Sequence, residues 1–165
     1  MPALKIGDAA PDISAQTQDG GRFALSEFRG KQVVVLFFYP ADGTAICTAE
    51  ACAFRDSYED FAKAGAVVIG ISGDSNDSHQ KFAVDHKLPF LLASDPQGEL
   101  RMALGVPKTL GIFPGRVTYV IDKQGTVRLM FSAQFSASGH VKEALHVVRQ
   151  LAKEDGGGVQ SPATV

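Results

Sequence analysis

The stretch FYPADGTAICTAEAC, residues 38–52, joins an apolar run to an amphipathic segment and contains both cysteines of the chain. The run Val33–Tyr39 is apolar without alternation, which is typical of a strand buried on both faces. The segment that follows predicts a helix ending near Gly65, because its apolar residues recur with helical spacing at Ala51, Phe54, Tyr58 and Phe61. The run AVVIGI, residues 66–71, predicts a second buried strand. Two buried strands joined by a helix predict a βαβ unit with a right-handed crossover.

Other segments predict elements on either side of this unit. They are a hairpin around Gly20–Gly21, helices over 75–87 and 94–106, a hairpin around 123–125 and a last helix from Ser138. In the helix over 94–106, we expect Asp95 as the N-cap and Pro96 as the first helical residue. The sequence therefore predicts a single α/β domain over residues 1–153, with a mixed central sheet flanked by helices, an N-terminal hairpin and a disordered tail over 154–165.

Composition excludes several classes of protein. Of the 165 residues, 45% are hydrophobic and 21% are charged, which is the profile of a globular domain with a core of its own. The net charge of −2 gives no reason to expect nucleic acid or an anionic membrane as a partner. The longest apolar run is far shorter than the ~20 residues that span a bilayer.

Two cysteines are too few for a disulfide scaffold, so each is inert, metal-binding or reactive. A buried cysteine is often an inert small hydrophobe. Zinc fits poorly, because the four histidines show no ligand spacing that would complete a site with the two thiols. Cys47 is predicted at the N-terminus of a helix, where free N–H groups and the helix dipole favour an anion. This position favours a reactive thiolate.

The spacing of the two thiols predicts a mechanical constraint. Cys47 falls on the apolar stripe of the predicted helix, whereas Cys52 falls about 140° around it on the solvated side. Their Cα atoms are roughly 8.6 Å apart in an ideal helix, and a disulfide needs about 4.4–6.8 Å. A bond between them therefore requires the first turns of the helix to unwind.

The stretch 38–75 strongly resembles the peroxiredoxins. The family signature Pro-x-x-x-Thr-x-x-Cys is met by Pro40, Thr44 and Cys47. A second cysteine five residues later, followed by AFRD, is similar to the bacterioferritin-comigratory protein or peroxiredoxin Q subfamily. The resemblance continues through KLPFLLASD (87–95) and FPGRVTYVIDKQG (113–125) and so covers most of the chain. It implies a thioredoxin-like fold.

The resemblance implies an antioxidant thiol peroxidase acting on hydrogen peroxide and organic hydroperoxides. Cys47 is then the peroxidatic cysteine, which becomes a sulfenic acid, and Cys52 resolves it as an intramolecular disulfide. Thioredoxin or a similar dithiol reduces that disulfide, and no metal or organic cofactor takes part. The alternative is a redox sensor or holdase, which uses the same thiols to change its binding to a partner without enzymatic turnover.

The resemblance also implies roles for four residues around the thiol. Thr44 hydrogen-bonds the thiolate and a peroxide oxygen, and Pro40 shields the site. Arg116 stabilises the thiolate and polarises the peroxide. Glu50, one turn beyond Cys47, orients that arginine. The subfamily further implies a monomer. A bacterial cytoplasm is the expected location, because the sequence starts directly at the domain, and a plastid protein without its transit peptide is the alternative.

One departure from the family pattern lies beside the peroxidatic position. Many relatives have Thr-Pro-Gly-Cys where this chain has Thr44-Ala45-Ile46-Cys47. Ile46 cannot readily adopt a positive φ, so the loop geometry is expected to differ. We hypothesise that Ile46 makes the entrance more apolar and favours organic hydroperoxides.

Overall fold

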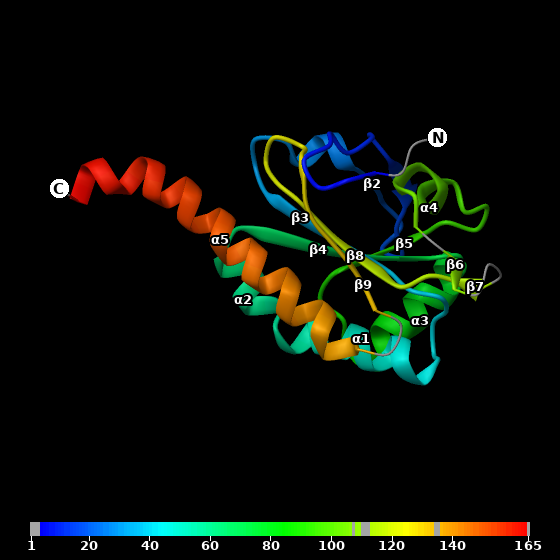
Figure 1. The fold of residues 1–165 in the computed structure, drawn as a ribbon. Helices are drawn as coiled ribbons and strands as arrows, with labels where there is room; N and C mark the ends of the chain where they lie inside the picture. The colour runs from blue at the N-terminus through cyan, green and yellow to red at the C-terminus, as the bar shows by residue number, and fades with distance from the viewer. Residues whose placement is uncertain (1–3, 107, 110–112, 134–135, 165) are drawn as a thin grey trace.

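The computed structural model describes residues 4–106, 108–109, 113–133 and 136–164, and its centre is a five-stranded mixed sheet (Figure 1). The strand order is β5-β4-β3-β8-β9. The strands are β3 (Val33–Phe38), β4 (Ala66–Ser72), β5 (Leu91–Ser94), β8 (Val117–Ile121) and β9 (Val127–Ser132). β3, β4 and β5 run parallel, β8 is antiparallel to β3, and β9 is antiparallel to β8 at the edge of the sheet. Two short pairs lie outside this sheet: β1 (Ser14–Gln16) with β2 (Arg22–Ala24), and β6 (Lys108–Thr109) with β7 (Phe113–Pro114).

The central strand β3 divides the core into two halves. Successive side chains of a strand point to opposite faces, so a strand covered on both sides is apolar at every position. Val33, Val35 and Phe37 pack with residues of the helices on one face. Val34, Leu36 and Phe38 pack on the other face with the N-terminal segment and α4 (Glu99–Leu104).

Four helices cover the first face of the sheet, whereas α4, the 3-10 helix η1 and the N-terminal hairpin lie over the second face (Figure 1). The four helices are α1 (Ala45–Asp56), α2 (Tyr58–Lys63), α3 (Asn76–His86) and α5 (Ala137–Thr164), and η1 is Leu25–Phe28. The structure confirms the βαβ unit, both hairpins and the helices over 75–87 and from residue 138.

One predicted helix is interrupted, although it ends near Gly65 as predicted, and the start of another is wrong. The helix after Cys47 does not run unbroken to Gly65, because Ser57 departs from helical geometry (φ −102°, ψ 6°) and separates α1 from α2. The helix predicted from Pro96 begins only at Glu99, after Gly98 in the left-handed region. Asp95 nevertheless binds its N-terminus, since its carboxylate accepts hydrogen bonds from the backbone N–H groups of Leu100 and Arg101.

The last helix extends past the predicted end of the domain. The backbone of α5 is helical up to Thr164, and Figure 1 shows its C-terminal half projecting from the body of the molecule. The domain end at residue 153 and the disordered tail stay predictions, which amide hydrogen exchange over residues 154–165 would test.

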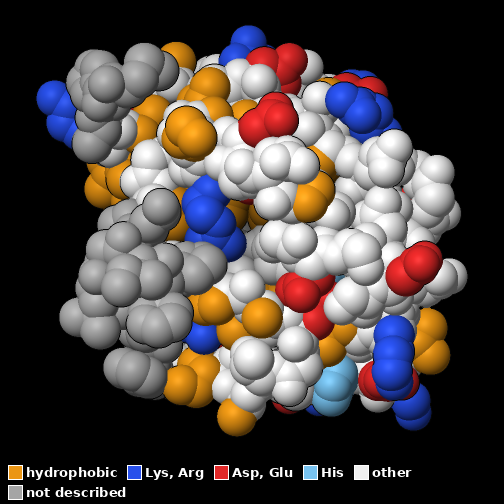
Figure 2. All heavy atoms as spheres, turned by 90° about the vertical axis from the view of Figure 1, so that its right-hand side faces the viewer, with side chains coloured by type: hydrophobic (Ala, Val, Ile, Leu, Met, Phe, Trp, Pro, Cys, Tyr) orange, Lys and Arg blue, Asp and Glu red, His pale blue; other side chains and the backbone are white. Residues whose placement is uncertain are grey.

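Figure 2 shows the face that carries β6, β7, α3 and α4. Basic and acidic side chains alternate over the described part of this face, with hydrophobic side chains between them. Within the described residues, no helix has both the length and the apolar character needed to span a bilayer.

The close packing of β3, β4 and β5 predicts that Gly70→Ala destabilises the protein. A Cβ atom at Gly70 would lie 2.7 Å from Phe37 Cζ and 2.8 Å from Leu92 Cδ2, and both side chains are fully buried. We expect the free energy of unfolding in urea to fall by about 1–3 kcal/mol, as for other overpacked cores. Gly73→Ala is the matched control, because its Cβ would meet nothing closer than 3.6 Å. Equal unfolding midpoints for the two variants would contradict the packing.

Candidate active site

Cys47 lies in the first turn of α1 and is almost fully buried, with 1% of its surface exposed. Gly43, with φ +77°, makes the sharp turn that brings the chain from β3 into this helix. Thr44 is the N-cap residue, but its hydroxyl does not cap the helix and instead donates to the carbonyl of Ala41 at 2.9 Å. The N–H groups of the first turn are therefore not satisfied by that side chain, and the helix terminus beside Cys47 favours a negative charge.

Arg116, which is 69 positions from Cys47 in the sequence, brings a buried positive charge to this thiol. It directly precedes β8, and only 4% of it is exposed. Its Nη2 atom donates to Cys47 Sγ at 3.3 Å, and its Nη1 atom donates to Glu50 Oε1 at 2.7 Å. Burial lowers the pKa of Arg116, but Glu50 and Cys47 outweigh this effect and hold it above its usual value. The guanidinium thus stays charged and favours the thiolate over the thiol.

Glu50 completes this cluster from the next turn of α1. The side chain is fully buried, and burial raises the pKa of its carboxyl group to about 7 against the opposing effect of Arg116. Within the described residues, Glu50 Oε2 has no hydrogen-bond partner. The group facing it is His140 Nδ1, at 3.4 Å.

His140, on α5, was missed as a site residue because the sequence shows it only as one histidine of an amphipathic helix. It is fully buried, and its Nε2 atom lies 2.6 Å from the carbonyl of Ala133, so Nε2 carries a proton. Its Nδ1 atom lies 2.8 Å from Thr118 Oγ1, which can donate to it. Burial lowers the pKa of His140, with a smaller contribution from Arg116. Because the Nδ1 lone pair of a neutral His140 accepts from Thr118, the ring offers Glu50 Oε2 neither a hydrogen bond nor a charge.

A second polar cluster anchors the loop between β3 and α1. The carboxylate of Asp42 accepts hydrogen bonds from the Tyr39 hydroxyl, from Ser78 Oγ at 2.8 Å and from His79 Nδ1 at 2.7 Å. Its backbone N–H donates to Asp74 Oδ2 at 2.7 Å. Burial raises the pKa of Asp42, but these bonds, led by that from His79, outweigh it and hold the pKa below its usual value. The loop that carries Pro40 and Thr44 is thereby tied to α3.

His79 was also not predicted as a partner of this loop. It is fully buried, and its Nε2 atom lies 3.1 Å from the carbonyl of Ala93. The two ring nitrogens of His79 thus join the carboxylate of Asp42 to the backbone of β5. Ligand atoms of Asp42, Asp74 and His79 lie within 4.8 Å of one another, but the hydrogen bonds just described already occupy them. The arrangement is that of a structural anchor.

Cys52 lies on the same continuous helix as Cys47 and is partly exposed. Its Sγ atom is 3.9 Å from His86 Nδ1 at the end of α3, and the neighbouring Arg55 Nη1 donates to the His86 carbonyl at 2.8 Å. Both cysteines are free thiols. The predicted constraint therefore applies to this state, since the two thiols are five residues apart on an intact helix.

The predicted site residues fall into two groups. The structure brings Cys47, Glu50 and Arg116 into direct contact. Pro40 and Thr44 belong to the loop beside them, and the Thr44 hydroxyl is bonded to Ala41. Ala45 and Ile46 are the first two residues of α1, and Lys87 is the only described non-glycine residue with a positive φ. Ile46 therefore has a negative φ, which does not require a glycine at this position.

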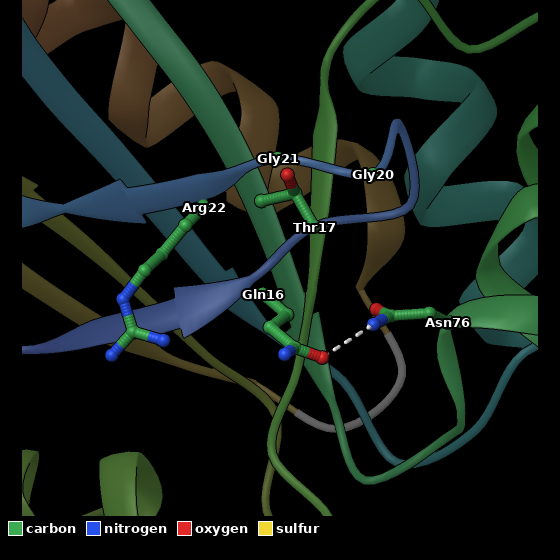
Figure 3. A pocket seen from close by; sticks show the side chains of 6 residues that line it. All are labelled: Gln16, Thr17, Gly20, Gly21, Arg22 and Asn76. Carbon is green, nitrogen blue, oxygen red and sulfur yellow. Dashed lines mark hydrogen bonds between the residues drawn. The ribbon is translucent and has the colours of Figure 1, made fainter.

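A hollow of about 390 Å³ lies elsewhere, at the tip of the N-terminal hairpin (Figure 3). Gln16 and Asn76 face one another across it, with Asn76 Nδ2 donating to Gln16 Oε1 at 3.3 Å. None of the predicted site residues lines this hollow. It is open and polar, and no cysteine, histidine or acidic residue is among those that line it.

Comparison with known proteins identifies the fold around this cysteine. Residues 6–130 match the model of the AhpC/TSA family. The chain belongs to the AhpC/TSA family. Chloroplastic peroxiredoxin Q of Sedum lineare is 51% identical over 146 residues, which cover 88% of this chain and 78% of that protein.

Solved structures agree with this assignment. Peroxidoxin BcpB of Mycobacterium tuberculosis superposes with a TM-score of 0.82 at 38% identity, over 90% of this chain and 98% of that one. The bacterioferritin comigratory protein of Xanthomonas campestris, studied for its alkyl peroxide reduction activity, gives a TM-score of 0.80 at 28% identity over 91% and 98% of the two chains. The predicted resemblance to peroxiredoxins of the Q type and the thioredoxin-like fold are confirmed.

The raised pKa of Glu50 predicts a pH dependence of stability in this AhpC/TSA protein. Since the folded-state pKa of about 7 lies above the usual value of 4.5 for a glutamate, folding favours the protonated carboxyl group. The wild type should lose stability relative to Glu50→Gln as pH rises from about 4.5 through 7, by on the order of 3 kcal/mol. Urea unfolding of both reduced proteins at several pH values measures this difference. Glu59→Gln on the exposed side of α2 is the control, and a wild-type to Glu50→Gln difference that stays constant with pH would refute the assignment.

Proposed function

We propose that this chain is a thiol-dependent peroxidase that reduces hydrogen peroxide and organic hydroperoxides through Cys47. The observation that carries the proposal is the buried Cys47 thiol at a helix N-terminus, 3.3 Å from the guanidinium of Arg116. A helix terminus and a cation together favour a thiolate, which is the nucleophilic form of cysteine. The peroxiredoxin Q relatives support the same activity.

The first step transfers one oxygen atom to sulfur. The Cys47 thiolate attacks one peroxide oxygen, an S–O bond forms and the O–O bond breaks. Its electron pair leaves with the second oxygen, which takes a proton and departs as water or an alcohol. Sulfur is oxidised to sulfenic acid and the peroxide is reduced. Arg116 is placed to hold the peroxide and to stabilise the charge that develops on the leaving oxygen.

The residues around Cys47 take supporting roles in this proposal. Glu50 holds Arg116 through the 2.7 Å ion pair, and His140 braces Glu50 from α5. Thr44 would have to exchange its bond to Ala41 for one to the thiolate or the peroxide. Such a rotation of a threonine hydroxyl is a local change of rotamer. Pro40 shields the thiolate from the loop side.

The second step forms a disulfide between Cys47 and Cys52. The Cys52 thiolate attacks the Cys47 sulfur, and the sulfenic oxygen leaves as water after taking a proton. Because an intact helix keeps the two Cα atoms roughly 8.6 Å apart, the first turns of α1 open before this bond forms. A thioredoxin-type dithiol then takes up the oxidising equivalents by thiol–disulfide exchange and restores both thiols.

The proposal requires no metal or organic cofactor, because both steps use only cysteine sulfur, peroxide and a dithiol. A monomeric state and the lack of nucleic-acid and membrane partners stay predictions. The compartment also stays a proposal. The chloroplastic relatives support the plastid alternative, and the bacterial cytoplasm stays a prediction.

Rapid-quench mass spectrometry tests the peroxidase. Reduced protein is mixed with one molar equivalent of peroxide and quenched over milliseconds to seconds. We expect the wild type to lose two hydrogen atoms, mapped to a Cys47–Cys52 disulfide, and Cys52→Ser to gain one oxygen on Cys47. Cys47→Ser is the control that should stay unmodified on this timescale. Thiols that remain reduced for minutes would contradict a peroxidase, and slow oxidation with a large loss of helix would favour the sensor or holdase.

A further inference from the structure

Arg101 is a second arginine near the site, and neither the sequence signature nor the proposed chemistry uses it. It lies on α4, on the opposite face of the sheet from Cys47, and is partly buried. Its Nη1 atom donates to the carbonyl of Gly115 at 3.1 Å, and its Nη2 atom donates to the carbonyl of Tyr39 at 3.2 Å. One guanidinium therefore joins two backbone segments.

These two carbonyl groups stand directly before two site residues. Tyr39 precedes Pro40 at the start of the loop that leads to Cys47, and Gly115 precedes Arg116. The pairing of β3 with β8 ends at Phe38 and Val117, one residue before Tyr39 and two residues after Gly115. Beyond that pair Tyr39 stays bonded to β4, since its N–H donates to the carbonyl of Ile71 at 3.0 Å, but the β3–β8 ladder no longer joins it to the segment before β8. The two nitrogens of the Arg101 guanidinium bind the carbonyls of Tyr39 and Gly115 and so join the two segments where the hydrogen bonds between β3 and β8 stop.

Arg101 is itself held firmly. Its backbone N–H donates to Asp95 Oδ2 at 3.1 Å, and its guanidinium lies 5.6 Å from the centre of the Phe38 ring. The last turn of α4 is fixed by Tyr119, whose hydroxyl donates to the carbonyl of Leu104 at 3.0 Å. Burial lowers the pKa of Arg101, opposed by Asp95, Tyr119 and Cys47, and an arginine so placed stays charged. These contacts hold the backbone and the guanidinium of Arg101 in place on α4.

We propose that Arg101 is a positioning residue for the peroxide reaction, holding the backbone before Pro40 at a fixed separation from the backbone before Arg116. The inference rests on the proposed peroxidase function. It implies that Arg101 acts through Arg116 and the loop, without touching the peroxide. Small displacements of groups that orient a substrate can reduce a rate by up to about a hundredfold.

The test compares two electrophiles, a peroxide and iodoacetamide, that the Cys47 thiolate attacks. The reaction with peroxide needs Arg116 and the Pro40 loop at the correct separation. The reaction with iodoacetamide needs only an accessible thiolate. Rate constants with both reagents are measured for Arg101→Lys and Arg101→Met, in the Cys52→Ser background, at a pH at which Cys47 is ionised. Lysine keeps the charge, but its single ammonium group cannot form the two-carbonyl fork. Arg149→Met is the control, because Arg149 is an exposed arginine of α5.

We expect the ratio of the peroxide to the iodoacetamide rate constant to fall at least about tenfold in both Arg101 variants and to stay constant in the control. A merely structural role would change the two rates together and leave the ratio unaltered. An unaltered ratio, or a fall in Arg101→Met alone, would overturn the positioning role. A wild type that reacts with peroxide no faster than free cysteine would overturn the peroxidase as well, so the two failures are distinct.

Discussion

The buried contact of Arg116 with Cys47 and Glu50 is the interaction on which the site depends. It joins the first two turns of α1 to the start of β8, residues 66 to 69 positions apart in sequence. A charge removed from water is costly unless it is paired, so the buried guanidinium of Arg116 requires the acceptors that Glu50 and Cys47 supply. The pair therefore requires α1 to dock on the sheet in one register, and the same register places the thiol against the guanidinium.

Two further polar contacts hold the backbone around that pair. Asp42 ties the loop before α1 to α3 through His79 and Ser78. Arg101 ties the start of the same loop to the residue before Arg116. The loop is thus anchored from both faces of the sheet, whereas Cys52, partly exposed on α1, makes a long contact of 3.9 Å with His86. A helix whose start is fixed and whose second cysteine lies free of the core suits a thiol that must first be held in place and later released.

Much of the fold could be predicted because local patterns agree with it. The apolar runs of β3 and β4 and the helical spacing after Cys47 follow from burial alone, and the signature around Pro40, Thr44 and Cys47 indicated the family. The helix boundaries were less predictable. Asp95 and Pro96 give a strong local start signal, yet α4 begins at Glu99 because Gly98 turns the chain and the Asp95 carboxylate reaches N–H groups further along. The break at Ser57 does carry a start signal, a serine followed by Glu59 and Asp60, but this signal lies inside a continuous helical pattern and the serine side chain makes no capping hydrogen bond.

The sequence by itself determined the two thiols, their spacing and the helix terminus that favours an anion at Cys47, because these depend on neighbours within a few residues. Only the tertiary structure decided which charged groups surround that thiol. His140 and Arg101 resemble ordinary polar residues of amphipathic helices, and His79 follows a capping serine on α3. Their roles arise because the sheet brings distant segments together. A polar atom buried between those segments then needs a hydrogen-bond partner from one of them.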